Sequence, residues 1–305
     1  MPRSELGQRV AVAAVGIPVA IAAIVAGGWY LGVLLAAVAA GSAVELFRLA
    51  ERGGVRPMRS LGAALAAGST LIAAAEPSFE GAAGPLFGSA VAVLLLTAGA
   101  AVWVRGVEGR PLTSVATTLL GGIFPGWTLA HGMFLRHDYT QAHEAATFGA
   151  PGLLASEAWA GAALVVFAVG ITWINDSCAY FAGRKWGRRK LIPTVSPGKT
   201  VVGAVAGLVG AVVVGAAYAA IVLDGWYGFG IGWAAGAVGG LLIGVVAQVG
   251  DLAESVLKRE AGVKDSGTLF PGHGGFLDRL DALFFAIPLA YWYFAIVLGQ
   301  GGGVS

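Results

Sequence analysis

Nine apolar segments divide this chain, and charged residues or glycine and proline separate each segment from the next. The segments lie near residues 10–27, 29–49, 61–75, 88–104, 115–135, 159–175, 201–223, 229–249 and 283–299. Most of them approach the roughly 20 residues that a helix needs to cross a bilayer. Only 12% of the residues are charged, whereas a soluble domain has about 25%. The sequence therefore predicts an all-α fold, a polytopic integral membrane bundle of about nine transmembrane helices.

The placement of the basic residues supports this number of spans. With nine spans and a cytoplasmic N-terminus, 18 of the 19 lysines and arginines fall on the cytoplasmic side, and only Arg136 falls outside. Cytoplasmic loops carry such an excess of Lys and Arg, and one span more or fewer would scatter these residues over both faces. We therefore predict a multi-pass protein of the cell membrane whose N-terminus and two highly charged loops are cytoplasmic.

The two charged loops follow the sixth and eighth predicted spans. We accordingly divide the chain into N-terminal transmembrane helices, residues 1–150, and a C-terminal catalytic region, residues 151–305. The N-terminus has no clear signal-peptide cleavage site, so we expect a retained first helix. A lone cysteine, Cys178, excludes an intrachain disulfide and a multi-cysteine metal cluster. Small residues on the seventh span are expected to let helices pack closely, namely Gly203, Gly207 and Gly210.

The first polar cluster occupies residues 175–200, after the sixth span. Asp176 lies at or just inside the membrane segment, where an ionisable side chain is costly and usually marks function. The pentapeptide SPGKT, residues 196–200, places a lysine and a threonine around a turn just before a predicted helix, which suits a phosphate group. It lacks the first glycine and the spacing of a P-loop. The five cations of residues 184–190 also fit a juxtamembrane patch that sets topology and attracts anionic lipid headgroups.

The second polar cluster, residues 248–281, is the most densely charged part of the chain. Asp251 and Glu254 are three residues apart, as are Asp278 and Asp281, so each pair is expected to share one face of a helix. Carboxylates on two helices can converge on a hard divalent cation, which takes oxygen ligands. The alternative is an exposed charged loop with acids that cap helices.

A glycine-rich turn at residues 271–275 separates these two pairs of acids, because glycines permit backbone conformations that other residues avoid. His273 lies in this turn and is the only histidine in either cluster. Three roles remain open for it: a general base, a hydrogen-bond donor to phosphate, and a hydrogen bond within the loop.

Two stretches of the sequence match a known family pattern. One runs SVLKR at residues 255–259, KD at 264–265 and PGHGGFLDRLD at 271–281, and the other runs from Asn175 through Gly183-Arg184 to SPGKT. These stretches resemble the phosphatidate cytidylyltransferases, also called CDP-diacylglycerol synthases. The resemblance covers spans six to nine, and the N-terminal spans resemble the family only in hydropathy. Many members carry a glutamate shortly after SPxKT where this chain has Val202, so no role of that glutamate is carried over.

The resemblance implies that CTP and phosphatidic acid react to CDP-diacylglycerol and pyrophosphate with one Mg²⁺ ion or two. The lipid phosphate is already an anion, so a strong general base is not required, which weakens that role for His273. The metal ligands would be Asp251, Asp278 and Asp281. The substrate-binding residues would be Asn175, Asp176, Ser196, Lys199 and Thr200. The catalytic residues would be Lys258, Arg259, Lys264, Asp265, His273 and Arg279.

Other interpretations remain. A transporter or channel would spread ionisable residues through the membrane, whereas here they gather at the cytoplasmic ends, with Glu45 the main exception. A transferase that moves a phospho-alcohol from a CDP-lipid would carry a DxxDGxxAR pattern, which is absent. A third interpretation keeps the chemistry but changes the lipid, for example to an isoprenoid-ether phosphate. The expected partners are the substrates CTP and phosphatidic acid and the lipid bilayer, and no nucleic acid is expected. The resemblance is compatible with a homodimer.

Overall fold

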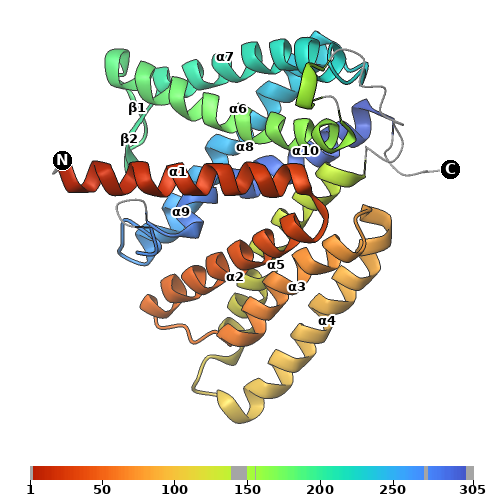
Figure 1. Ribbon diagram of the computed structural model, residues 1–305. Coiled ribbons are helices and arrows are strands. Elements are labelled where there is room, and N and C mark those ends of the chain that lie inside the picture. The colour runs from red at the N-terminus through yellow and green to blue at the C-terminus, as the bar shows by residue number, and fades with distance from the viewer. Residues whose placement is uncertain (1–2, 139–149, 155, 271–273, 300–305) are drawn as a thin grey trace. The chain divides into compact units, whose positions relative to one another are not determined.

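The computed structural model describes residues 3–138, 150–154, 156–270 and 274–299, and helices dominate this part of the chain (Figure 1). The elements are α1 (Arg3–Ala26), α2 (Gly28–Arg52), α3 (Arg59–Ala75), α4 (Phe79–Val104), α5 (Pro111–His137), η1 (Gly152–Leu154), α6 (Glu157–Trp186), β1 (Lys190–Ile192), β2 (Ser196–Thr200), α7 (Val201–Tyr218), η2 (Ala219–Asp224), α8 (Trp233–Glu260), α9 (Phe276–Leu280) and α10 (Leu283–Val297). Each predicted apolar segment overlaps a helix, which confirms the helical fold. The structure adds a small β-hairpin, which the sequence did not predict, and it places Asp278 on a separate short helix, α9.

Six helical segments in the described residues are long and apolar enough to cross a membrane. They are Gly28–Arg52, Phe79–Val104, Ala158–Trp186, Val201–Asp224, Trp233–Glu260 and Phe276–Val297. Two shorter apolar helices, Ala14–Ala26 and Arg59–Ala75, accompany them. The protein is therefore a multi-pass membrane protein, and the predicted number of about nine spans is an approximation.

The chain forms two compact units. Unit 1 comprises residues 1–133 and 256–280, and unit 2 comprises residues 134–255 and 281–305. The charged residues 256–280 thus pack with the N-terminal helices, although they follow the eighth predicted span in sequence. The predicted boundary between residues 150 and 151 distinguishes N-terminal transmembrane helices from a C-terminal catalytic region. This division stays a prediction.

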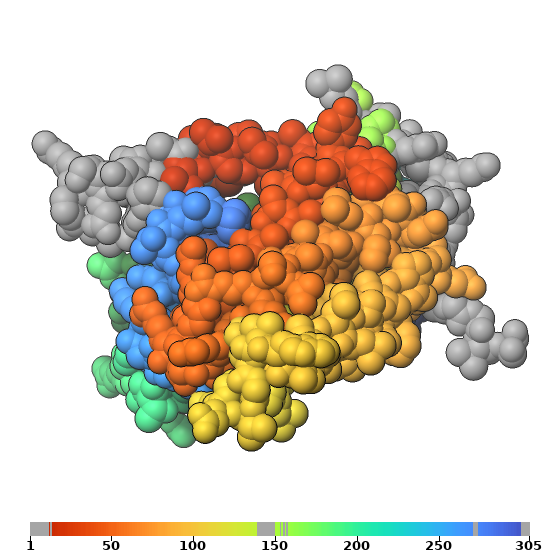
Figure 2. Space-filling view, turned by 90° about the horizontal axis from the view of Figure 1, so that it is seen from below, coloured from red at the N-terminus to blue at the C-terminus, as the bar shows by residue number. Residues whose placement is uncertain are grey.

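The core of unit 1 depends on glycines that let α2, α3 and α5 approach closely. The ring of Phe47 on α2 is fully buried and lies against Gly62 on α3 and Gly121 on α5, where an added Cβ would overlap it. Helix α4 packs on α3 and leaves apolar side chains such as Leu95 and Trp103 exposed. Figure 2 shows α4 as part of the yellow surface on the visible face. An exposed apolar face of this kind suits contact with lipid.

In unit 2, α6 and α7 run side by side (Figure 1). A Cβ at Gly203 of α7 would lie 2.6 Å from the carbonyl oxygen of Ala179 on α6. A Cβ at Gly210 would lie 2.6 Å from Cys178 Sγ, and Gly207 lies equally close to α6. The predicted packing role of these three glycines is confirmed, because any larger side chain would push the helices apart.

The SPGKT segment forms strand β2 rather than the predicted turn. It pairs with β1 in an antiparallel hairpin, with Lys190 opposite Thr200 and Ile192 opposite Ser196. Pro197 is tolerated because β2 is an edge strand, where a missing N–H donor leaves no pairing unmet. Helix α7 begins directly afterwards at Val201, as expected, so the hairpin delivers Lys199 to the N-terminus of a membrane-spanning helix.

Candidate active site

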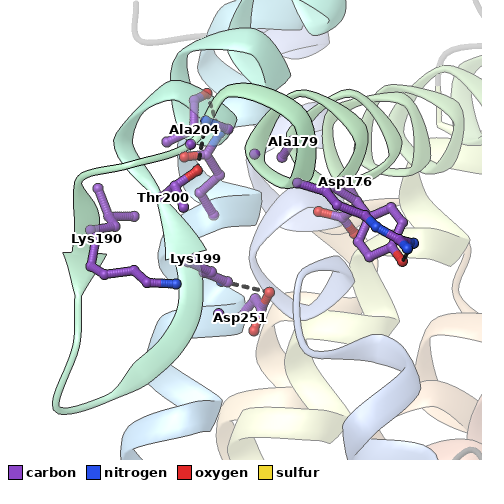
Figure 3. Close-up of a pocket in the computed structure, with 15 residues that line it drawn as sticks. Asp176, Ala179, Lys190, Lys199, Thr200, Ala204 and Asp251 are labelled. Carbon is purple, nitrogen blue, oxygen red and sulfur yellow. Dashed lines mark hydrogen bonds and ion pairs between the residues drawn. The ribbon is translucent and has the colours of Figure 1, made fainter.

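A cavity of about 660 Å³ opens in unit 2 where α6, the hairpin, the start of α7 and α8 meet (Figure 3). Small-molecule sites measure roughly 300–1,000 Å³, so the cavity is large enough for a nucleotide. Its charged lining residues are Asp176, Arg184, Lys190, Lys199 and Asp251. The fold thereby brings together acids and cations from four elements that are separate in sequence.

An ion pair crosses this cavity. The Nζ atom of Lys199 on β2 lies 2.6 Å from Oδ2 of Asp251 on α8, as the dashed line in Figure 3 shows. Their side chains are 27% and 30% exposed, so both groups reach solvent from the cavity wall. Asp176 is exposed on the α6 side of the same cavity. The site therefore has two carboxylates and a lysine that are accessible to a charged ligand.

Thr200 connects the hairpin to α7 and holds the start of that helix. Its Oγ1 accepts a hydrogen bond from the backbone N–H of Gly203 at 3.1 Å, which caps α7 at a position that favours Thr. A Cβ at Gly183 of α6 would lie 2.9 Å from this Oγ1, so glycine keeps room for the cap. Thr200 lines the cavity, but it is buried and its hydroxyl oxygen caps α7; its predicted contact with substrate stays a prediction.

Two other predicted substrate-binding residues lie off the cavity wall. Asn175 is fully buried, and its Oδ1 accepts a hydrogen bond from Gln248 Nε2 at 2.9 Å. Gln248 also donates to the carbonyl oxygen of Ala204 at 2.9 Å, which ties α6, α7 and α8 together next to the cavity. Ser196 begins β2 and is likewise absent from the lining. Neither placement tests the predicted contact with substrate, which stays a prediction.

A second polar site lies within unit 1, around Asp278 on α9. Its Oδ1 pairs with Lys258 Nζ at 2.8 Å, and both side chains are nearly buried. Its Oδ2 accepts hydrogen bonds from Ser266 N at 2.8 Å, Ser266 Oγ at 2.7 Å and Gly275 N at 2.9 Å. Both carboxylate oxygens of this predicted metal ligand are thus engaged by the protein. In this structure Asp278 orders the segment that surrounds it.

Glu45 on α2 completes this second site and was not predicted to belong to it. Its side chain accepts hydrogen bonds from the backbone N–H groups of Phe276 at 3.1 Å and Leu277 at 2.9 Å, and from Ser266 Oγ at 3.1 Å. A carboxylate at a helix N-terminus is favoured by the exposed amides there. Glu45 is only 4% exposed. The one signal in the sequence was an isolated acid in an apolar helix.

Glycines near the two acids of this site have a specific purpose. Gly274 has a φ of +77°, which favours glycine, and a Cβ there would overlap the Asp278 carboxylate. A Cβ at Gly275 would overlap the Glu45 carboxylate, and one at Gly267 would lie 2.6 Å from Glu45 Oε1. The backbone can approach the two acids only because these positions carry no side chain.

The remaining predicted site residues are more open. Arg259, Lys264, Asp265 and Arg279 are all exposed. Asp281 follows the end of α9, and its Oδ1 accepts a hydrogen bond from Ala282 N at 2.7 Å. Asp278 lies on α9, and Asp281 lies in the short turn between Leu280, where α9 ends, and Leu283, where α10 begins. The expectation that the two acids share one helix face stays a prediction. His273 lies outside the described residues.

Two carboxylates of the cavity, those of Asp176 and Asp251, are the candidates for holding a magnesium ion. Among the described residues, no three His, Cys, Asp or Glu side chains form a group that could hold a metal ion. Magnesium is, however, often bound through one or two carboxylates together with substrate phosphates and water. Asp176 and Asp251 line one cavity and are exposed or partly exposed there, so they fit that mode of binding, whereas the Asp278 side chain is nearly buried.

The chain matches the model of the cytidylyltransferase family over residues 7–297. It belongs to this family. The match includes the N-terminal helices, so the resemblance extends well beyond the four C-terminal spans to which the sequence motifs confined it. In a cytidylyltransferase, the cavity of unit 2 is the candidate site for a cytidine nucleotide, because it combines suitable size with groups that bind phosphate.

The curated relatives of this cytidylyltransferase align with different shares of its length. A phosphatidate cytidylyltransferase from Synechocystis sp. is 33% identical over 299 residues, which are 95% of this chain and 97% of the relative. A protein of the same name from Brucella suis is 46% identical over 138 residues, 45% of this chain and 48% of the relative. Another from Thermotoga maritima is 40% identical over 139 residues, 46% of this chain and 52% of the relative. The chain therefore aligns with nearly all of one relative and about half of the other two.

Proposed function

We propose that this cytidylyltransferase makes CDP-diacylglycerol and pyrophosphate from CTP and phosphatidic acid, a step of phospholipid biosynthesis. The supporting observation is a nucleotide-sized cavity lined by Asp176, Lys199 and Asp251 in a multi-pass membrane protein of this family. An oxygen of the lipid phosphate attacks the α-phosphorus of CTP. The bond from the α-phosphorus to the oxygen that bridges it to the β-phosphorus breaks, and pyrophosphate leaves with that electron pair.

Lys199 is well placed to favour this displacement. Negative charge grows on the leaving pyrophosphate, and a cation held next to it lowers the barrier. Without substrate, Lys199 is paired with Asp251. Because both side chains are partly exposed, the lysine can exchange Asp251 for a phosphate oxygen without the cost of leaving a buried carboxylate unpaired.

We propose that Asp176 and Asp251 hold Mg²⁺ when CTP is bound. Their carboxylates come from α6 and α8 and face the same cavity, and the exchange of Lys199 to phosphate leaves Asp251 available to a cation. Bound Mg²⁺ would neutralise charge on the phosphate oxygens and orient the triphosphate. Asp251 thus keeps its predicted role as a metal ligand, and Asp176 gains one.

The cations of unit 1 divide into two roles in this proposal. Arg259, Lys264 and Arg279 are exposed and would attract the anionic substrates to the surface of unit 1. Lys258 is committed to Asp278 and would act by holding residues 264–270 in place.

We also propose that the protein forms a homodimer, which a mass measurement in detergent by light scattering would test.

The direct test of this function is an assay with purified protein in mixed micelles. With CTP, phosphatidic acid and Mg²⁺, we expect pyrophosphate and CDP-diacylglycerol to form in equal amounts, and we expect EDTA to stop the reaction. An ether-linked phosphatidate supplied in parallel would show whether the lipid linkage matters. Absence of both products under these conditions would refute the proposed function.

We propose that the N-terminus and both charged loops face the cytoplasm of the cell membrane, as the distribution of basic residues predicts. In a Cys178→Ser background, cysteines at positions 188 and 264 should react with an impermeant maleimide only from the cytoplasmic side. A cysteine at position 78 should react only from the opposite side. Labelling of positions 188 and 264 from opposite faces would contradict a shared cytoplasmic location.

Replacing Lys199 should weaken the use of CTP. Loss of one hydrogen bond to a charged group costs about 1.5–3 kcal/mol, so Lys199→Ala should lower kcat/KM for CTP about ten- to a hundredfold. Lys199→Arg should restore only part of the wild-type kcat/KM for CTP, because a planar guanidinium does not replace the compact ammonium on this short hairpin. Saturation curves for CTP at fixed lipid provide the measurement, with Arg189→Ala as the matched control. Equal curves for Lys199→Ala and wild type would show that Lys199 only anchors the hairpin.

A further inference from the structure

A second cleft, of about 480 Å³, lies at the C-terminal end of α6 next to the cavity of unit 2. It is lined by Phe181, Arg184, Lys185 and Trp186. Arg184 also lines the larger cavity, so a single guanidinium borders both spaces. The proposed binding of CTP and Mg²⁺ requires none of these four side chains.

The side chains of this cleft are typical of a membrane surface. Phe181 is 69% and Trp186 61% exposed, at the end of a helix long and apolar enough to cross a membrane. The Lys185 Nζ lies 4.8 Å from the centre of the Trp186 ring, a cation–π contact. Aromatic side chains and long cations concentrate at the level of lipid headgroups. One part of the cleft therefore suits acyl chains, and the other suits a negative headgroup.

Arg184 is held in position between the two spaces. Its Nη1 donates a hydrogen bond to Tyr180 Oη at 3.1 Å, one helical turn earlier on α6. Tyr180 itself lines the nucleotide cavity. A guanidinium offers several donors in a rigid fork that matches phosphate geometry, and one bond to Tyr180 leaves most of these donors for a ligand.

We propose that the cleft binds the acceptor lipid and that Arg184 holds its phosphate at the entrance to the nucleotide cavity. This inference rests on the proposed function, because it assigns the site of the second substrate. The lipid phosphate must reach the α-phosphorus of CTP while the acyl chains stay in apolar surroundings. A cleft with exposed aromatic residues and a cation that borders the nucleotide cavity meets both requirements.

Kinetics can separate this role from nucleotide binding. Arg184→Ala should raise the KM for phosphatidic acid about tenfold or more, the loss expected for a charge-assisted contact, and should leave the KM for CTP unchanged. Tyr180→Phe should raise the KM for phosphatidic acid by a smaller factor. Arg184→Lys should raise that KM less than Arg184→Ala does. Arg188→Ala is the matched control, since it removes an exposed cation from the same basic patch outside both spaces. A raised KM for CTP with an unchanged KM for phosphatidic acid would overturn the proposal.

A binding measurement keeps the inference separate from turnover. In nanodiscs, a photoactivatable phosphatidic acid should crosslink to residues 180–186, and unlabelled phosphatidic acid should compete, whereas phosphatidylcholine and inorganic phosphate should not. Arg184→Ala should reduce this crosslinking and Arg188→Ala should not. Equal competition by phosphatidylcholine, or equal crosslinking in Arg184→Ala and wild type, would overturn the lipid site. Failure of wild-type protein to turn over CTP and phosphatidic acid would instead refute the proposed function, with the crosslinking result still decisive for the cleft.

Discussion

Replacing Asp251 by asparagine is expected to lower kcat/KM by roughly 10²–10³, the loss seen when one preorganised electrostatic group is removed. The change keeps the shape of the side chain but removes the charge that pairs with Lys199 at 2.6 Å. It also removes one of the two carboxylates of the cavity that we assign to Mg²⁺. The rate of pyrophosphate release should therefore respond to Mg²⁺ only at much higher concentrations than in wild type.

The control for Asp251→Asn is Glu260→Gln, the same acid-to-amide exchange at an exposed position on the same helix. It should leave both the rate and the Mg²⁺ dependence unchanged. Asp176→Asn should weaken the Mg²⁺ response in the same direction as Asp251→Asn. An Asp251→Asn protein with more than a tenth of wild-type kcat/KM, a loss below about 1.4 kcal/mol, would contradict the assignment of Asp251 as a metal ligand.

Replacing Asp278 by asparagine is expected to release residues 263–270 from unit 1. The exchange removes the negative charge that pairs with the nearly buried Lys258 at 2.8 Å, and breaking a buried ion pair in this way costs about 3–5 kcal/mol. It also weakens the hydrogen bonds from Ser266 and Gly275. The measurement is the rate of limited proteolysis within residues 263–270, together with the thermal midpoint in detergent. The rate of proteolysis should rise strongly and the thermal midpoint should fall strongly. Turnover should be lost as well.

Glu45→Gln separates this structural role from metal binding. Glu45 lies on α2 and contacts the same segment through Ser266, Phe276 and Leu277, so its loss should also expose residues 263–270 to protease. Asp265→Asn, at an exposed position, serves as the control and should not. An Asp278→Asn protein that keeps wild-type proteolysis but requires more Mg²⁺ would show that Asp278 is a metal ligand rather than an anchor of its loop.

The predicted site residues differ in how well their setting could be read from the sequence. Lys199 and Asp176 could be singled out because a charged side chain at the end of an apolar segment is costly and usually marks function. Asn175 and Ser196 belong to the same motif, yet they lie off the cavity wall, because a motif records which residues occur together and not which way each one points. Glu45 was missed because its partners lie more than 200 residues later, and no local pattern connects them.

The sequence by itself determined that this protein is a helical membrane protein, which segments form its helices, and to which family it belongs. These properties follow from local features, since the bilayer sets the length of an apolar segment and since the family motifs are continuous stretches. Only the tertiary structure decided how the charges are paired. Lys199 binds Asp251 because the hairpin brings β2 to α8 in unit 2, and Lys258 binds Asp278 because glycines let the intervening backbone approach two buried acids. Such pairings depend on close packing between distant segments, where the absence of a single Cβ decides whether two charged groups can meet.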